Sequence, residues 1–299
     1  MKLLVLGAGG QVGHELVRAL APVGEVVSAT RDDAGTLRVD LANSDSLAAA
    51  LDAACADVIV NAAAYTAVDR AEDEPELADR VNHRAVAEIG AWAKRNGRRV
   101  VHYSTDYVFD GSSKRPYREN DATAPLGAYG RSKLAGEDAL RASGARHLIV
   151  RTAWVYAARG NNFLRTMLRL AGERDELRVV ADQTGAPTPA LRVADASAAM
   201  LRQWLDDGEN AGRDGTYHLV SAGRCSWFEF AEAIVDGAAD RGVIERRPRV
   251  VPIATAEYPT RARRPAYSVL DTSKAASTFG LQLADWHAGL ESVFDQLAT

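Results

Sequence analysis

The sequence predicts an α/β fold in which a doubly wound parallel sheet carries a smaller C-terminal domain. Short runs that are apolar throughout alternate with amphipathic stretches in the first half of the chain, and a glycine-rich turn follows the first run. Wholly apolar strands that alternate with helices belong in a parallel sheet covered by helices on both faces. The second half lacks this alternation and has proline-containing turns between its helical stretches, which indicates a separate, smaller unit.

The elements follow one another in a regular order. We expect strands at residues 3–6, 25–29, 57–61, 99–104 and 147–152, and helices at 11–20, 44–54, 76–96 and 129–142, with Ser44 as an N-cap. Further helices are expected at 161–171, 193–205, 227–240 and 286–297, with an exposed loop at 242–249. The predicted domains are residues 1–155 and residues 156–299, with segments near 190–220 returning to the core of the first.

Composition excludes several classes of protein. A net charge of -4 and a pI near 5.9 do not suit a dedicated nucleic-acid binder. Cys55 and Cys225 lack the spacing of a metal site, and the small number of cysteines is typical of a reducing cytoplasm. No apolar run approaches the length of a membrane span, and no signal peptide is recognisable. We therefore expect a cytoplasmic protein without nucleic-acid or membrane partners.

The glycine-rich turn predicts a dinucleotide site of the Rossmann type. Gly7, Gly10 and Gly13 follow the first strand, and the helix begins at Gln11. Glycine lets the backbone approach a pyrophosphate, the helix start offers free N–H groups, and Gly13 permits close packing of helix on sheet. A glycine-rich turn alone is a weak signal, but here it stands between a strand and a helix, as such a site requires.

The end of the second strand bears on the choice of cofactor. An acidic residue there favours NADH, but the chain has Ala29, Thr30 and Arg31. Arg31 could accept the 2′-phosphate of NADPH, or it could be a solvated turn residue. We expect NADPH or NADH to be used, with NADPH favoured.

Tyr129 and Lys133 form the catalytic pair that we expect. They are four residues apart and share one face of a helix. An ammonium group beside a phenol stabilises the phenolate and so helps the tyrosine to give its proton to a developing alkoxide. Ser104 and Thr105 end the preceding strand, so hydroxyl groups should meet this pair at one mouth of the sheet. A lone Y-x-x-x-K is a common chance match, and its position in this series is what gives it weight.

These motifs together resemble the extended short-chain dehydrogenase/reductase family and, within it, the dTDP-4-dehydrorhamnose reductases. The resemblance rests on G-A-G-G-Q-V-G, N-A-A-A-Y, S-T-D-Y-V-F-D-G and Y-G-R-S-K, and it extends along the chain through R-T-A-W-V-Y, D-Q-T-G-A-P-T and Y-P-T-R-A-R-R-P. It implies a doubly wound (Rossmann) domain with a smaller C-terminal substrate-binding domain. It also implies reduction of the 4-keto group of dTDP-4-dehydro-L-rhamnose to dTDP-L-rhamnose.

The resemblance assigns site residues as well. Thr105, Tyr129 and Lys133 would be catalytic, with Tyr129 as proton donor. The cofactor would contact Gly7, Gly10, Gln11, Val12, Gly13, Arg31, Asp40, Leu41, Ala63, Ala64, Tyr65, Tyr129 and Lys133. The sugar nucleotide would contact Thr105, Asp106 and Trp154, although Trp154 by itself would suit a core. Arg261 and Arg264 could clamp its diphosphate or belong to a solvated loop, and residues 72–74 are interpreted as an acidic helix start.

Alternative functions remain open at this point. One is 4-keto reduction of a related nucleotide-linked deoxysugar on an antibiotic pathway, and another is a regulatory or binding subunit of the same fold that performs no catalysis. Some members of the family form dimers through a metal held by carboxylates, and Glu15 matches one of these ligands. The segment Pro189, Ala190, Leu191, Arg192 offers no second carboxylate. We therefore expect no metal site, and either a monomer or a weak homodimer that is independent of metal.

Overall fold

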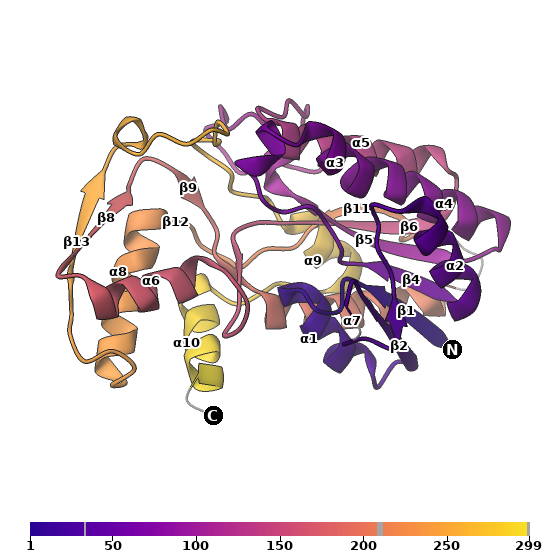
Figure 1. Cartoon of the computed structure of the whole chain (residues 1–299), viewed down its shortest axis with the longest axis horizontal. Coiled ribbons are helices and arrows are strands. Elements are labelled where there is room, and N and C mark those ends of the chain that lie inside the picture. The colour runs from indigo at the N-terminus through magenta and orange to yellow at the C-terminus, as the bar shows by residue number, and fades with distance from the viewer. Residues whose placement is uncertain (33, 208–211, 298–299) are drawn as a thin grey trace.

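The computed structural model describes residues 1–299 except 33, 208–211 and 298–299. Its larger part is built on a parallel sheet in the order β11-β6-β5-β4-β1-β2-β3 (Figure 1). The strands are β1 (Lys2–Leu6), β2 (Glu25–Thr30), β3 (Leu37–Arg38), β4 (Val58–Asn61), β5 (Arg99–Thr105), β6 (Arg146–Thr152) and β11 (Gly215–His218). The doubly wound parallel sheet predicted from the sequence is confirmed.

Helices cover both faces of this sheet. One face packs against α1 (Gln11–Leu20), α7 (Ala190–Asp206) and α9 (Ser273–Phe279), and the other against α2 (Ser44–Ala54), α4 (Ala85–Arg95) and α5 (Ala128–Ala142). Figure 1 shows these two layers below and above the sheet. Strands such as β1 and β4 are buried almost completely because each of their faces meets a helical layer.

Two local predictions were wrong. Ser44 is not the N-cap of α2, because Asn43 accepts the N–H of Ser46 while the Ser44 hydroxyl donates to Glu88. The single helix expected at 76–96 consists of α3 (Pro75–Asp79), a π-helical turn (η2, Arg80–Arg84) and α4. A π turn has no period that the spacing of apolar residues would reveal.

The smaller part has a core of its own. Two helices, α6 (Phe163–Glu173) and α8 (Trp227–Asp240), pack on β8 (Glu176–Val180), which pairs in parallel with β13 (Arg249–Ile253), and α10 (Trp286–Leu297) packs on α8. Two short pairs join β7 (Val155–Tyr156) to β10 (Thr188–Pro189) and β9 (Thr184–Gly185) to β12 (Cys225–Ser226). None of these strands was predicted, since most have two residues. None of the helices in the described residues has the length and apolar character needed to cross a bilayer.

The order of the sheet locates the site. The chain leaves β1 towards β2 on one side, while β4 lies on the other side of β1, so the direction of winding reverses between β1 and β4. Ligands of doubly wound sheets bind where the strand order reverses, at the carboxyl ends of the strands. The loops after β1 and β4 meet there, and short 3-10 turns follow β4 (η1, Arg70–Glu72) and β5 (η3, Asp106–Val108); a third one, η4 (Thr255–Glu257), follows β13 in the smaller part.

Candidate active site

The turn between β1 and α1 requires its glycines. Gly7 has a φ of +79°, and a Cβ on it would lie 2.6 Å from the backbone nitrogen of Ala63. A Cβ on Gly13 would overlap the carbonyl oxygen of Gly7. Gly10 precedes α1 in an extended conformation, and no side chain caps the helix. The first N–H groups of α1, including those of Gln11 and Val12, are therefore available to an anion, which fits the pyrophosphate of a dinucleotide.

The residues expected near an adenosine lie at the ends of β2 and β3. Arg31 follows β2 and is exposed, and its guanidinium forms no hydrogen bond or ion pair with any described residue. Leu41 is buried, whereas Asp40 is exposed and accepts the N–H of Ala42. Arg38 is paired with Thr30 across the two strands, so a second basic residue stands at this corner.

Tyr129 stands in the first turn of α5, where several groups hold it. Its ring meets the ring of Tyr107 edge to face, with 5.6 Å between centroids. Glu72 accepts the N–H of Ala128 at 2.7 Å and so caps the start of α5 from a distant segment. The sequence predicted for Glu72 only a place in an acidic helix start. The structure gives it the more specific role of fixing the helix that carries the phenol.

The phenol of Tyr129 is held in its protonated form. Burial raises the pKa of Tyr129, a hydrogen bond with Thr105 lowers it in part, and the carboxyl group of Asp106 raises it further. The Thr105 hydroxyl also donates to Asp106 at 3.0 Å and accepts the N–H of Tyr107. The predicted neighbours Thr105 and Tyr129 are thus brought together at one mouth of the sheet.

Lys133 lies one turn beyond Tyr129 and is only 2% exposed. Its Nζ donates to the carbonyl oxygen of Tyr103 at 2.6 Å and lies 3.5 Å from Nε2 of His102. Burial lowers the pKa of Lys133 to about 8, and the carboxylate of Glu137 offsets this in part. The amine is therefore held by strand β5, and the described contacts include no hydrogen bond from it to Tyr129.

Asp106 begins η3 and is 2% exposed. Burial raises its pKa to about 6, although hydrogen bonds from Ser268 and Thr105 lower it. A buried carboxyl group whose pKa is raised in this way is typical of a functional site. Asp106 lies directly beside Thr105, which places it within the same group as Tyr129.

An aromatic pair joins the two parts of the molecule. The indole of Trp154 stacks on that of Trp227 from α8, with 3.4 Å between centroids and 4° between planes. Trp154 has a positive φ of 49°, and a Cβ on Gly185 would overlap its ring. Strain of this kind persists where the surroundings enforce it, often at binding sites. Trp227 was not recognised in the sequence because nothing near it in the chain marks it as a partner of Trp154.

Arg264 belongs to an ion-pair group near a cavity of about 390 Å³. It pairs with Asp69 at 2.7 Å and donates to the hydroxyl of Tyr107. Arg261 pairs with Asp73. The cavity is lined by Arg264 and by residues that include Phe163, Met167, Gln183, Trp227, Tyr258 and Thr260. Acidic residues from the segment after β4 thus pair with both arginines, but only Arg264 lines the cavity, and Arg261 is not among its lining residues.

The carboxylate of Glu15 has a partner on its own helix. Arg18 donates to it at 3.2 Å and also pairs with Asp195 on α7. The described residues contain no cluster of three or more His, Cys, Asp or Glu side chains with the arrangement of a metal site. Arg192, in the segment that lacks a second carboxylate, has a buried Nε without a partner among the described residues.

Comparison with known proteins agrees with this arrangement. Residues 1–299 match the family described as the RmlD substrate binding domain. The chain is 51% identical to the dTDP-4-dehydrorhamnose reductase of Burkholderia thailandensis, over 96% of this chain and 95% of that protein. The chain belongs to the dTDP-4-dehydrorhamnose reductase family.

Two further members support this assignment. The dTDP-4-dehydrorhamnose reductase of Escherichia coli is 45% identical over 100% of this chain and 99% of its own. The crystal structure of the Bacillus anthracis dTDP-4-dehydrorhamnose reductase in complex with NADP has a TM-score of 0.86 and 34% identity, and covers 99% of both chains. The family resemblance found in the sequence is confirmed.

Proposed function

We propose that this protein reduces the 4-keto group of dTDP-4-dehydro-L-rhamnose to dTDP-L-rhamnose, with NADPH as the preferred cofactor. The observation that carries the proposal is the contact of Tyr129 with Thr105 at the end of β5, with Lys133 one turn further along α5. The full-length identity to proteins named for this reaction supports the choice of substrate. The binding of NADP by the Bacillus anthracis relative supports the choice of cofactor.

The cofactor would lie across the reversal of strand order. The pyrophosphate would meet Gly10, Gln11 and Val12, the glycines Gly7 and Gly13 would allow its approach, and Arg31 would meet the 2′-phosphate. The remaining contacts would come from Asp40, Leu41, Ala63, Ala64, Tyr65, Tyr129 and Lys133. When bound, the cofactor supplies the hydride that the ketone carbon receives.

The protein itself contributes a proton donor and the groups that position the substrate. Tyr129 donates its phenolic proton to the ketone oxygen as negative charge develops there, and burial keeps that proton on the phenol at neutral pH. Thr105 holds the phenol through its hydrogen bond. Asp106 would contact the sugar, and Trp154 would pack against it.

The diphosphate and nucleoside would extend into the smaller part of the molecule. The cavity beside Arg264 offers a basic group at one side and aromatic and apolar side chains at the other, including Trp227 and Phe163. This combination suits a phosphate followed by a nucleoside. We propose that the part after residue 155 binds most of the substrate, except for the segment near 190–220, which packs with the sheet.

The direct test is oxidation of NADPH that depends on added sugar nucleotide, followed by absorbance and with the product identified by NMR. We expect dTDP-4-dehydro-L-rhamnose to be the best of a panel of dTDP-4-keto-6-deoxysugars. A higher kcat/KM for another member of the panel would reassign the substrate. An absence of turnover with every member, despite tight NADPH binding, would instead indicate a binding subunit.

The state of Glu15 leads to a proposal about assembly. Because Arg18 already neutralises this carboxylate, we propose a monomer, or a weak homodimer that does not depend on divalent metal. Sedimentation with magnesium and then with EDTA should give the same mass, and turnover should survive EDTA. A dimer that appears only with magnesium would contradict this proposal.

A further inference from the structure

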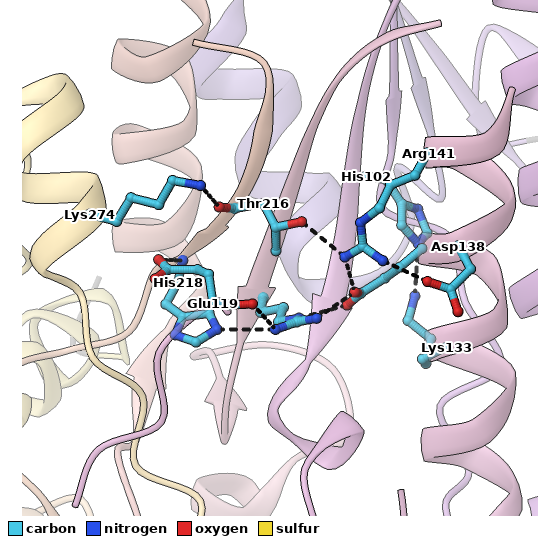
Figure 2. A network of polar contacts seen from close by, with 10 residues as sticks. His102, Glu119, Lys133, Asp138, Arg141, Thr216, His218 and Lys274 are labelled. Carbon is cyan, nitrogen blue, oxygen red and sulfur yellow. Dashed lines mark hydrogen bonds and ion pairs between the residues drawn. The ribbon is translucent and has the colours of Figure 1, made fainter. Parts of the chain in front are cut away.

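Asn61 and His102 form a buried pair beneath Lys133. They occupy paired positions on the neighbouring strands β4 and β5, and each is 0% exposed. Nδ2 of Asn61 lies 3.1 Å from Nδ1 of His102, and Nε2 of the same ring lies 3.5 Å from Nζ of Lys133. Figure 2 shows His102 and Lys133 at the edge of a larger polar network. The pair therefore connects the end of β4 with the lysine of the catalytic group.

The hydrogen bonds determine which nitrogen of His102 carries its proton. The N–H of Ala63 donates to Oδ1 of Asn61 at 3.2 Å, which leaves the amide NH₂ of Asn61 facing His102. Nδ1 of His102 must then accept, and in a neutral imidazole the proton lies on Nε2. Burial lowers the pKa of His102 well below its usual value, so the ring is neutral. The Nε2–H group thus points towards Lys133.

We infer that His102, oriented by Asn61, is a positioning residue that presents an N–H donor to the amine of Lys133 and so favours its uncharged form. An ammonium group has three donors and no acceptor, whereas a neutral amine can accept this N–H. One chain of hydrogen bonds then runs from Ala63, in the loop after β4 that would contact the cofactor, through Asn61 and His102 to Lys133. It links the position of this loop to the protonation of Lys133. This inference rests on the proposed use of NADPH.

Other charged groups around Lys133 act alongside His102. Glu137, one turn further along α5, favours the charged amine, but its carboxylate is shared with Arg151 of β6 and with Arg141. Tyr129 lies one turn before Lys133 on the same helix face. His147 on β6 contributes to the lowering of the pKa of His102. With the pKa of Lys133 at about 8, a modest change in the group facing it alters its charge in the range in which enzymes are assayed.

Two substitutions separate the two ends of the imidazole. His102→Gln can keep an N–H group where Nε2 faces Lys133, whereas His102→Asn keeps only the end that faces Asn61. The measurement is the dissociation constant of NADPH from pH 6 to 9.5, followed by cofactor fluorescence without substrate. We expect the wild-type affinity to fall as the pH rises through about 8, because Lys133 loses its charge there.

The two variants should behave differently. In His102→Asn, the pH at which the affinity for NADPH falls should rise by about half a pH unit to one pH unit. On the alkaline side this variant should therefore bind NADPH about three- to tenfold more tightly than the wild type. His102→Gln should follow the wild type. A profile unchanged in both variants would overturn the inference. A downward shift in His102→Asn would show that Nε2 accepts from an ammonium, and it would also overturn the inference.

A second measurement is made on the wild-type protein and uses a variant only to assign the signals. Long-range ¹H–¹⁵N NMR of the ¹⁵N-histidine-labelled wild-type protein reports the tautomer of each ring, and the His102 signals are those absent from His102→Gln or from His102→Asn. We expect protonated Nε2, and protonated Nδ1 would contradict the inference. Turnover of the wild-type protein with the sugar nucleotide is a separate result. If turnover is present and these profiles fail, only the inference about His102 is lost.

Discussion

On the cofactor side of Tyr129, the proposed pyrophosphate site is made of backbone at one turn between β1 and α1, whereas the proposed sugar site is made of side chains from distant segments. Gly7 and Gly13 act by having no side chain, and their positions follow from the sequence alone. Trp154, Trp227 and Arg264 come together only through the fold. The comparison teaches that a backbone site leaves a local pattern in the sequence and a side-chain site leaves little.

Substitution of Tyr129 should give the largest difference between the two sides, because it should lower turnover without weakening NADPH binding. Tyr129→Phe keeps the ring that contacts Tyr107 and removes the proton, so turnover should fall by about 100-fold or more. The dissociation constant of NADPH should change little, because the cofactor side stays intact. Tyr107→Phe is the matched control, and it should retain most of the turnover. Wild-type turnover in Tyr129→Phe would remove this residue from the mechanism.

Trp227→Ala tests the sugar side alone. Loss of the stack should free Trp154 and raise the KM of the sugar nucleotide by about tenfold, in line with the contribution of a buried aromatic contact. The KM of NADPH should not change. Trp227→Phe, which keeps an aromatic ring, should have a KM for the sugar nucleotide between those of the wild type and Trp227→Ala. An equal loss for both ligands would mean that the stack supports the whole fold rather than the sugar side.

Arg31→Ala tests the cofactor side alone. Because Arg31 has no partner among the described residues, its removal should cost the folded protein little. We expect the KM of NADPH to rise by about fivefold or more, the loss of one exposed charge contact, while the KM of NADH stays the same. Arg38→Ala, on the neighbouring strand, shows whether the second basic residue shares this role. If neither variant alters the ratio of the two cofactors, the basic corner does not bind the 2′-phosphate.

Asp106→Asn tests the stability of the fold rather than a ligand constant, and it should raise the free energy of unfolding at neutral pH. The folded pKa of Asp106, about 6, lies above the unfolded value near 4, so the folded state holds a proton that the unfolded state has lost. The stability that this proton contributes is present below about pH 4 and is lost as the pH rises through about 6. At pH 7.5 the variant should be more stable by about 3 kcal/mol, with little difference near pH 4. Urea denaturation at the two pH values measures this, and a variant that is equally destabilised at both would contradict the assigned cause.

The sequence predicted the features that depend on local patterns and missed those that depend on residues far apart in the chain. Strands β1, β2, β4, β5 and β6, helices α1 and α5, and the grouping of Thr105 with Tyr129 were predicted from local patterns in the chain, whereas the sheet strands β3 and β11 were not. The roles of Glu72 and Trp227 were not, since each acts on a residue more than fifty positions away in the chain. His102 was not predicted as a site residue, because its partner Asn61 is adjacent to it only across the sheet. The short strands of the smaller part were missed because two residues show no alternation.

The central claim is that both sides of the site meet at the ketone carbon beside Tyr129. The most direct test uses NADPH deuterated at carbon 4 of the nicotinamide, in each of its two stereoisomers, with dTDP-4-dehydro-L-rhamnose as substrate. NMR of the product should show deuterium at carbon 4 of the sugar from one stereoisomer only, and none from deuterated water at that position. Deuterium at another carbon, or none from either stereoisomer, would contradict the account.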